Sequence, residues 1–396
     1  MIFEAQLEDP TPEREHATID DCIDQAVYAE EMGFDGIWAV EHHSLVSYSH
    51  MPAPEIFLSA VAARTSRVRI GHGAVCMPFG YNHPIRVAER AAMLDVISHG
   101  RLNLGAARGA TEQEMSLCGV KKEDTEAQVR EALRIIARAW RGDTFSWDSD
   151  LISIQAPPDR PAHTILPRPV QVPHPPLFLA CSRPDTVRTA ARYGVAPMVL
   201  GYDGPEAMAD IRRMYDEERA ISSEDDLVSP GQVNTEFVAL CPTALSEDAN
   251  EGLTIGARAQ RFFAEAIQYW AQPGLQPPAR NTDREDNIAV MNARAKKLEQ
   301  NFAEAAKRGE MPERDSRYFS GGIWSVDHPF GDPHKAIDYV RRLESGGVTE
   351  CMCMIQMGTL TQEQCLETIR LWGQEVIPKF RASGSDEASV AATSAR

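Results

Sequence analysis

The chain has 396 residues, a length that one (β/α)₈ barrel with insertions commonly occupies, and its 43% hydrophobic and 25% charged residues are typical of a globular protein with a large core. A formal net charge of −18 repels phosphate backbones and anionic lipid headgroups, and no apolar run approaches the roughly 20 residues that span a bilayer. Nucleic acid and membranes are therefore poor partners, and because Met1–Glu4 begins no signal peptide, a cytoplasmic location is expected.

The first half of the chain alternates short apolar segments with amphipathic ones. Ile2–Leu7 predicts a strand, and a helix is expected to begin at Thr18, with Asp21 as its capping-box partner, and to end at Gly33. The next predicted elements are strand Phe34–Val40, helix Glu55–Arg64, strand Val68–Val75, helix Pro84–Ile97, strand Arg101–Ala107 and helix Gln128–Trp140.

The second half continues the alternation around two irregular regions. Residues 143–176 predict an excursion with a small hairpin, and residues 256–331, broken at Gln272-Pro273-Gly274 and irregular from Arg314, predict an inserted lid. The regular predicted elements are strand Leu177–Cys181, a helix from Pro184, strand Ala196–Leu200, helix Pro205–Ala220, strand Val233–Cys241, helix Pro333–Glu344, strand Thr349–Ile355 and a helix from Thr361 capped by Gln364.

This alternation predicts the fold class. Repeated strand and helix units require parallel strands with right-handed crossovers, and about eight of them favour closure into a (β/α)₈ TIM barrel. The alternative is an open doubly wound sheet, which the absence of Gly-x-Gly-x-x-Gly after the first strand disfavours. We therefore expect one barrel domain over residues 1–380 and a disordered tail over residues 381–396.

The eight cysteines do not predict a disulfide framework. They occur singly, apart from Cys351 and Cys353, whose spacing places both on one side of a strand. Free and mostly buried thiols are expected.

Glu41-His42-His43 follows the second predicted strand, at the end of the barrel where active sites lie. Alternation along a strand places Glu41 and His43 on one side and His42 on the other. Three interpretations remain open: acid/base or cofactor contact, imidazoles bonded only within the loop, or a metal site with help from His72.

Three further strand ends carry candidate cofactor contacts. Gly73-Ala74 offers small residues that a flat ring could approach closely. Arg108 suits bidentate phosphate binding, although a surface arginine is the alternative. Ser182 stands at a helix start that could bind an anion, or it is only the N-cap of that helix.

Together these motifs resemble the bacterial luciferase-like flavin monooxygenases, over about residues 1–380. The resemblance is carried in chain order by Gly-Phe-Asp-x-x-Trp at Gly33–Trp38, Glu41-His42-His43, Gly71 to Pro78, His83-Pro84-Ile85-Arg86, Gly100-Arg101-Leu102 leading to Arg108-Gly109, Pro197-Met198, Gly331-Asp332-Pro333 and Gly358-Thr359-Leu360.

The resemblance implies a (β/α)₈ barrel that uses FMN, delivered as FMNH₂ by a separate reductase, to activate O₂ as a C4a-peroxyflavin. It implies that His42 is the catalytic histidine, flanked by Glu41 and His43. It also implies that Gly73 and Ala74 are joined by a cis peptide under the flavin. The remaining implied flavin contacts are Arg108 and Ser182 at the phosphate, and Gly201 and Tyr202 after the sixth strand.

Some positions depart from the family pattern. Ala107 stands where the luciferase α subunit has a reactive cysteine, Gln128 where a second phosphate arginine is expected, and Cys181 where a carboxylate precedes the serine. Light emission is therefore not implied. The expected reaction is oxygenation of a small organic substrate such as an aldehyde, ketone or terpene.

Other functions remain open: an F420-dependent oxidoreductase on the same fold, a non-catalytic flavin-binding protein, or a metal-dependent hydrolase. The resemblance also implies a homodimer, or a heterodimer with a related subunit, that assembles through helices Glu55–Arg64 and Pro84–Ile97.

Overall fold

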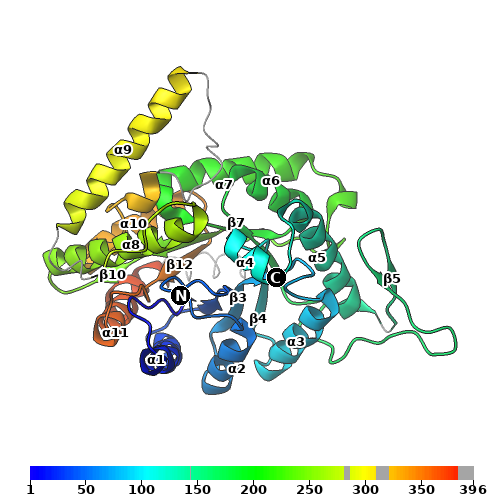
Figure 1. Cartoon of the computed structure of the whole chain (residues 1–396). Helices are drawn as coiled ribbons and strands as arrows, with labels where there is room; N and C mark the ends of the chain where they lie inside the picture. The colour runs from blue at the N-terminus through cyan, green and yellow to red at the C-terminus, as the bar shows by residue number, and fades with distance from the viewer. Residues whose placement is uncertain (143, 281–285, 309–320, 382–396) are drawn as a thin grey trace, which may run out of the picture.

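A computed structural model of the chain describes residues 1–142, 144–280, 286–308 and 321–381. Within these residues eight parallel strands form a closed barrel in the spatial order β1-β12-β9-β8-β7-β4-β3-β2 (Figure 1). The barrel strands are β1 (Ile2–Phe3), β2 (Gly36–Ala39), β3 (Arg69–Cys76), β4 (Leu102–Ala107), β7 (Leu177–Cys181), β8 (Ala196–Val199), β9 (Val238–Pro242) and β12 (Glu350–Met354). The predicted (β/α)₈ barrel is confirmed, and the open sheet is excluded.

Helices surround the barrel and bury its outer face. They are α1 (Pro12–Glu31), α2 (Pro54–Arg64), α3 (Pro84–Ile97), α5 (Thr125–Arg141), α6 (Pro184–Tyr193), α7 (Gly204–Ile221), α10 (Pro333–Ser345) and α11 (Gln362–Leu371). In α5, buried Val129, Leu133, Ile136 and Trp140 recur every three or four residues, which aligns them on the face toward the strands. The capping box that the sequence predicts at Thr361 and Gln364 is present at the start of α11.

Helix α1 begins earlier than the sequence predicts. It starts at Pro12, not Thr18, and the Thr11 hydroxyl accepts a hydrogen bond from the Arg14 backbone at 3.4 Å. Proline suits the first helical position, where no backbone donor is needed. The polar residues of this first turn are exposed, so they form the solvent face of a helix and not the loop that their polarity suggested.

Of the predicted strands, those that correspond to β1 and β9 extend furthest beyond the observed strands. β1 ends at Phe3 because Ala5 has φ +48°, which turns the chain out of extended conformation soon after Glu4. β9 begins at Val238, five residues after the predicted start. Both differences lie at element ends, and neither changes the order of the barrel.

The predicted hairpin in residues 143–176 is present. Strands β5 (Trp147–Asp148) and β6 (Ser153–Ile154) pair antiparallel and project beside α5 (Figure 1). Residue 143 itself is outside the described part of the chain.

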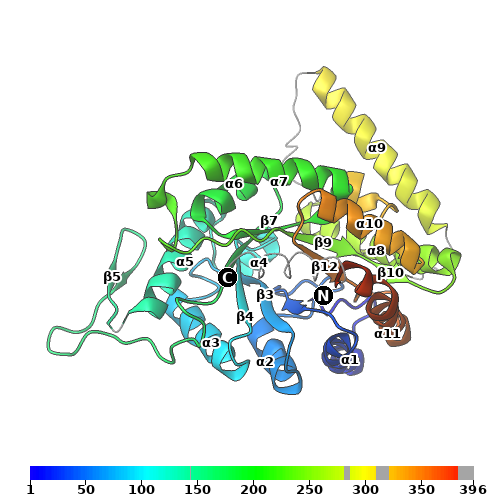
Figure 2. The same ribbon diagram turned by 180° about the vertical axis from the view of Figure 1, so that it is seen from behind.

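The second insertion begins before the predicted boundary at Gly256. Strand β10 (Ala244–Leu245) pairs with β11 (Phe330–Gly331), and helix α8 (Ala249–Ala271) packs on this pair so closely that Gly256 lies against the Phe330 ring. Helix α9 (Asn287–Lys307) reaches away from the barrel (Figures 1 and 2). Of the predicted irregular loop, residues 314–320 are outside the described part, as are residues 382–396 of the predicted tail.

The shorter elements lie in the loops. They are α4 (Glu112–Leu117), η1 (Lys122–Asp124), η2 (Gly201–Asp203), η3 (Glu224–Asp226), η6 (Gly321–Trp324) and η7 (Trp372–Val376). All eight cysteines are unpaired and six are buried, as the sequence predicts. None of the helices in the described ranges combines the length and the apolar character that crossing a membrane requires.

A tryptophan fills the barrel interior where glycine leaves room for it. A Cβ on Gly71 would lie 2.2 Å from Cε3 of Trp38, whose indole nitrogen donates to Glu350 at 2.6 Å and whose ring meets Phe178 edge-on. Because Trp38 is held on two sides, Gly71→Ala is expected to lower the free energy of unfolding by about 1–3 kcal/mol. Urea unfolding measures this. Gly36→Ala, whose Cβ would meet its nearest neighbours at 3.4 Å, is the matched control, and equal losses in both variants would contradict the overpacking argument.

Candidate active site

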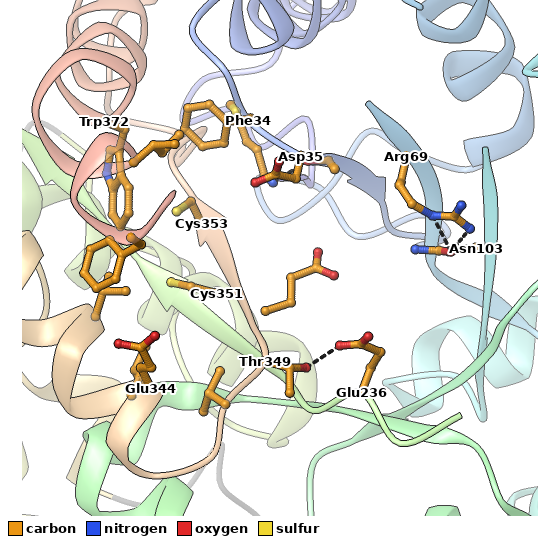
Figure 3. Close-up of a pocket in the computed structure, with 18 of the residues that line it drawn as sticks. Phe34, Asp35, Arg69, Asn103, Glu236, Glu344, Thr349, Cys351, Cys353 and Trp372 are labelled. Atoms are coloured by element: carbon orange, nitrogen blue, oxygen red, sulfur yellow. Dashed lines mark hydrogen bonds between the residues drawn. The ribbon is translucent and has the colours of Figure 1, made fainter. Parts of the chain in front are cut away.

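Two sizeable cavities occupy opposite ends of the barrel. One of about 630 Å³ lies at the N-terminal ends of the strands, where Arg69 bonds Asn103 at 2.9 Å and Thr349 bonds Glu236 (Figure 3). The other, of about 340 Å³, lies at the C-terminal ends. Barrel enzymes place their chemistry at the C-terminal ends, and the polar pairs at the opposite face serve stability. The smaller cavity is therefore the candidate active site.

His42 lies in the wall of this cavity just after β2. Its Nδ1 is 2.9 Å from Oε1 of Glu114, its Nε2 is 3.8 Å from Oε2 of Glu4, and its ring meets the Tyr48 ring edge-on. Burial disfavours the imidazolium, but the hydrogen bond and charge of Glu114, with the charges of Glu4 and Glu41, outweigh burial and raise the pKa of His42. The favoured ring is thus a cation that donates from Nδ1 and presents a second N–H at Nε2.

Glu114, which the sequence analysis missed, fixes the orientation of His42. It caps α4 through a capping box, in which Oε2 accepts from the Thr111 backbone and hydroxyl, while Oε1 also accepts from the His43 backbone at 3.1 Å. Burial by itself would raise the pKa of Glu114. The hydrogen bonds from these donors, of which His42 has the largest effect, outweigh burial and lower that pKa below its usual value. Thr111 and Glu114, three residues apart after a strand, are the sequence signal that could have found it.

Glu4, also missed, is the buried carboxyl that faces His42 from the end of β1. Burial raises the pKa of Glu4 to about 7, although His42 and the Tyr48 hydroxyl favour its ionised form. Its Oε2 is buried without a hydrogen-bond partner. Near neutral pH this side chain can therefore exist as a carboxylic acid with a proton to donate.

Glu4→Gln is expected to stabilise the protein above pH 7 and to change little near pH 4. The folded state favours protonated Glu4, so this contribution to stability is present below the ordinary pKa of 4.5 and is lost as pH rises through about 7. That shift corresponds to at most about 3 kcal/mol. Urea unfolding between about pH 4 and pH 9 tests the prediction, with exposed Glu31→Gln as control. A wild-type minus variant difference that does not change with pH would contradict it.

Glu41 and His43, both predicted to be catalytic, are hydrogen-bonded to each other beside His42. Glu41 Oε2 accepts from the Cys76 backbone at 2.8 Å, and its Oε1 is 3.0 Å from His43 Nε2 and 2.9 Å from the Asn82 amide. The His43 ring stacks on Tyr81 and does not line the cavity, whereas Glu41 and His42 do. Glu41 and His43 thus contact each other, while His42 contacts Glu114.

The next strand supplies a small-residue wall, and the peptide between Gly73 and Ala74 is cis, as the resemblance implied. Tyr202 also lines the cavity and is buried against Phe263 of α8. Gly201 does not line it, because a Cβ at this residue would point at the Leu240 carbonyl oxygen, 2.0 Å away. Of the two residues expected after β8, only Tyr202 reaches the cavity.

Cations gather at the ends of β4 and β7. Arg108, Lys122 and Arg183 all line the cavity, and Arg183 is close enough to Arg108 that, after burial, its charge helps to lower the Arg108 pKa. Arg108 donates from Nε to Thr125 and is 3.6 Å from Glu126. Sequence reasoning found Arg108 but missed Lys122 and Arg183.

Ser182 lines the cavity next to Arg183, but it is not the N-cap of α6. That position belongs to Arg183, whose backbone donates to the Thr186 hydroxyl at 3.2 Å. Gln128, which stands where a second phosphate arginine was expected, accepts a hydrogen bond from the Phe79 backbone instead. Positive charge at this end therefore comes from Lys122 and Arg183 in addition to Arg108.

The donor set fits a phosphorylated cofactor with a flat ring. The barrel places β1, β2, β3, β4 and β7 consecutively. The cavity wall therefore carries, in this order, Glu4 and His42, then Gly73-Ala74, and then Arg108 and Arg183. A phosphate would be held at the cationic end and a ring system beside the cis peptide. Among the described residues no group of three or more His, Cys, Asp or Glu side chains could hold a metal ion, so the hydrolase alternative has no ligand set there.

The closed parallel barrel and the cavity at its C-terminal end place the protein among the (β/α)₈-barrel enzymes. The sequence profile of the luciferase-like monooxygenases matches residues 2–350, and the chain belongs to this family.

The relatives include both oxygenases and hydride-transfer enzymes. The oxygenase component of the flavin-dependent trigonelline monooxygenase of Acinetobacter baylyi is 33% identical over 195 residues, 48% of this chain and 51% of that enzyme. The F420-dependent glucose-6-phosphate dehydrogenase of Microbacterium testaceum is 28% identical over 366 residues, 91% and 93% of the two chains. Some relatives are thus matched over only about half their length.

The fold also matches solved structures. The oxygenating constituent of 3,6-diketocamphane monooxygenase from Pseudomonas putida, in complex with FMN, superposes with a TM-score of 0.67 at 19% identity, covering 96% of this chain and 97% of that one. Taken together, the relatives support an oxidoreductase.

Proposed function

We propose that the protein is the oxygenase of a two-component flavin monooxygenase. It binds FMNH₂ delivered by a separate reductase and uses O₂ to oxidise a small, uncharged organic substrate such as an aldehyde, ketone or terpene. The observation that carries this proposal is the cavity itself, where an acid/base cluster and a cationic end flank the Gly73-Ala74 wall. The trigonelline relative, named as an oxygenase component, supports a separate reductase.

When bound, reduced flavin supplies the electrons that activate O₂. Arg108, Lys122 and Arg183 neutralise the phosphate, and Glu114 holds the imidazole of His42 by Nδ1 so that its Nε2–H faces the reacting groups. Helix α8 packs over the cavity through Phe263 and Ala271, which limits the access of water to the site.

The test mixes anaerobic FMNH₂ with the protein, adds O₂ and follows the return of oxidised-flavin absorbance by stopped flow. We expect reoxidation to be slower with protein than in buffer, and faster again in His42→Ala. Binding without any change in reoxidation would indicate the non-catalytic flavin-binding alternative. Absence of FMN binding would reject the proposal.

F420-dependent hydride transfer is the second candidate, because the match to the Microbacterium testaceum dehydrogenase extends over 91% of this chain. This function needs no O₂. Bleaching of oxidised F420 by an alcohol substrate under anaerobic conditions, with no uptake of O₂ in the presence of FMNH₂, would favour it.

We further propose that the oxygenase dimerises through α2 and α3, with a second copy or a related subunit. These helices expose large apolar side chains, Ile56 at 71% and Met93 at 58%, with Val96 and Ile97 beside them. Light scattering should give a dimer mass for the wild type and a monomer mass for Ile56→Glu/Met93→Glu. A monomeric wild type would contradict homodimerisation.

A further inference from the structure

Nε2 of His42 and Oε2 of Glu4 lie near each other in the cavity wall. His42 Nε2 and Glu4 Oε2 are 3.8 Å apart, too far for a hydrogen bond to each other. Glu4 is 6% exposed and its Oε2 has no hydrogen-bond partner, and within the described residues Nε2 of His42 makes no hydrogen bond either. A buried polar atom without a partner is costly, which calls for a ligand that satisfies it.

Both atoms present protons. Glu114 keeps the imidazole cationic, so Nε2 carries a hydrogen, and burial keeps a proton on Glu4 up to about pH 7. The titratable groups that face Glu4 are His42, Glu114 and Tyr48. The Tyr48 hydroxyl already donates to the Glu4 carboxyl, which leaves the acid hydrogen of Glu4 free to turn toward the cavity.

We propose that Glu4 and His42 form a two-donor site for one carbonyl oxygen, and that the substrates of this cavity are neutral aldehydes or ketones. An oxygen placed between two atoms 3.8 Å apart can lie within hydrogen-bond distance of both. This inference rests on the proposed monooxygenase function and narrows its substrate class.

The chemistry of the site selects a carbonyl over the other candidates. A carbonyl oxygen accepts through two lone pairs and donates nothing, so it matches two donors, whereas a hydrocarbon would leave both donors unsatisfied. A carboxylate substrate would be placed next to Glu114 and Glu41, whose charges disfavour a third anion. The apolar remainder of the substrate would contact Met198, Leu240 and Met352.

The first experiment reads the state of Glu4 directly and needs no cofactor. Infrared spectra near pH 6 should contain a carboxylic-acid C=O band that Glu4→Gln lacks and Glu13→Gln retains. Buried Glu350 remains in every variant and cancels in the difference spectrum. Cyclohexanone should shift the Glu4 band, whereas methylenecyclohexane, the same ring with CH₂ in place of oxygen, should not. A missing band, or one that cyclohexanone leaves unchanged, overturns the proposal.

The second experiment measures binding of the two probes by headspace analysis, with and without oxidised FMN. We expect Glu4→Leu to lose roughly tenfold of the wild-type preference for the ketone. The wild-type preference should also fall as pH rises through about 7, because ionised Glu4 repels the oxygen, while Glu4→Gln, whose amide donates at any pH, should stay constant. This pH comparison remains informative if Glu4→Leu does not fold.

Either proposal can fail by itself. If FMN does not bind but the Glu4 band shifts with cyclohexanone, the monooxygenase assignment fails and the carbonyl site stands. If FMN binds but Glu4→Leu keeps the ketone preference, the carbonyl site is rejected and the flavin assignment is unaffected.

Discussion

Replacement of His42 by alanine is expected to lower kcat by roughly 10²–10⁴-fold, the largest effect of any single substitution in this cavity. The variant removes an imidazolium that Glu114 orients through a 2.9 Å hydrogen bond and that faces the cavity through Nε2. It also leaves Glu114, a fully buried carboxylate, without its main partner. Product formation with FMNH₂, O₂ and an aldehyde or ketone substrate measures the loss, once a turned-over substrate is known.

Two variants separate chemistry from stability. His334→Ala changes an exposed histidine on α10 that does not line the cavity, and it should leave kcat unchanged. Glu114→Gln keeps the shape of the side chain but removes its charge, so the pKa of His42 should fall and the alkaline limb of the pH profile should move to lower pH. If His42→Ala retained wild-type kcat while binding FMN normally, His42 would have no catalytic role.

The double variant Arg108→Ala/Arg183→Ala is expected to raise the Kd for FMN roughly 100-fold or more. Hydrogen bonds to a charged group contribute about 1.5–3 kcal/mol each, and Arg108 and Arg183 lie close enough together in the cavity wall for both to contact one phosphate. Equilibrium titration of flavin fluorescence gives the Kd. Lys122 remains in the variant, so some affinity for phosphate should persist.

Riboflavin, which lacks the phosphate, provides the internal control. Its Kd should be nearly equal in the wild type and the double variant, because the ring end of the cavity at Gly73-Ala74 is intact. Arg213→Ala, an exposed arginine on α7, controls for a general loss of positive charge. An equal loss of affinity for FMN and riboflavin would show that these arginines support the fold and do not bind phosphate.

Local sequence patterns predict most helices and strands, because the backbone conformation of a segment depends largely on the residues within that segment. Helix α3 has the predicted bounds Pro84–Ile97, and β7 has the predicted bounds Leu177–Cys181, since proline, apolar spacing and chain turns act over a few residues. The failures have equally local causes. Thr11 and Pro12 begin α1 within a run of polar residues, and Ala5, with its positive φ, ends β1.

The residues of the candidate site are harder to predict from local sequence than the helices and strands are. His42, Tyr202, Arg108 and Ser182 could be found from their positions after strands, together with the resemblance to a known family. Glu4 could not, because a carboxylate near the start of a chain is usually exposed, and only the closed barrel buries it next to β2. Lys122 and Arg183 were likewise visible only as ordinary surface cations.

The sequence by itself determined the barrel, its element order, the family and the identity of the central histidine. Each of these follows from patterns of neighbouring residues, namely the repeating periodicity of the elements and the motifs at the strand ends. Only the tertiary structure decided which charges meet. Glu4, His42 and Glu114 lie up to 110 residues apart, and the consecutive places of β1, β2, β3 and β4 around the closed barrel bring them together. Protonation follows from that closure, since desolvation and pairing depend on what surrounds a group in space and not on its neighbours in sequence.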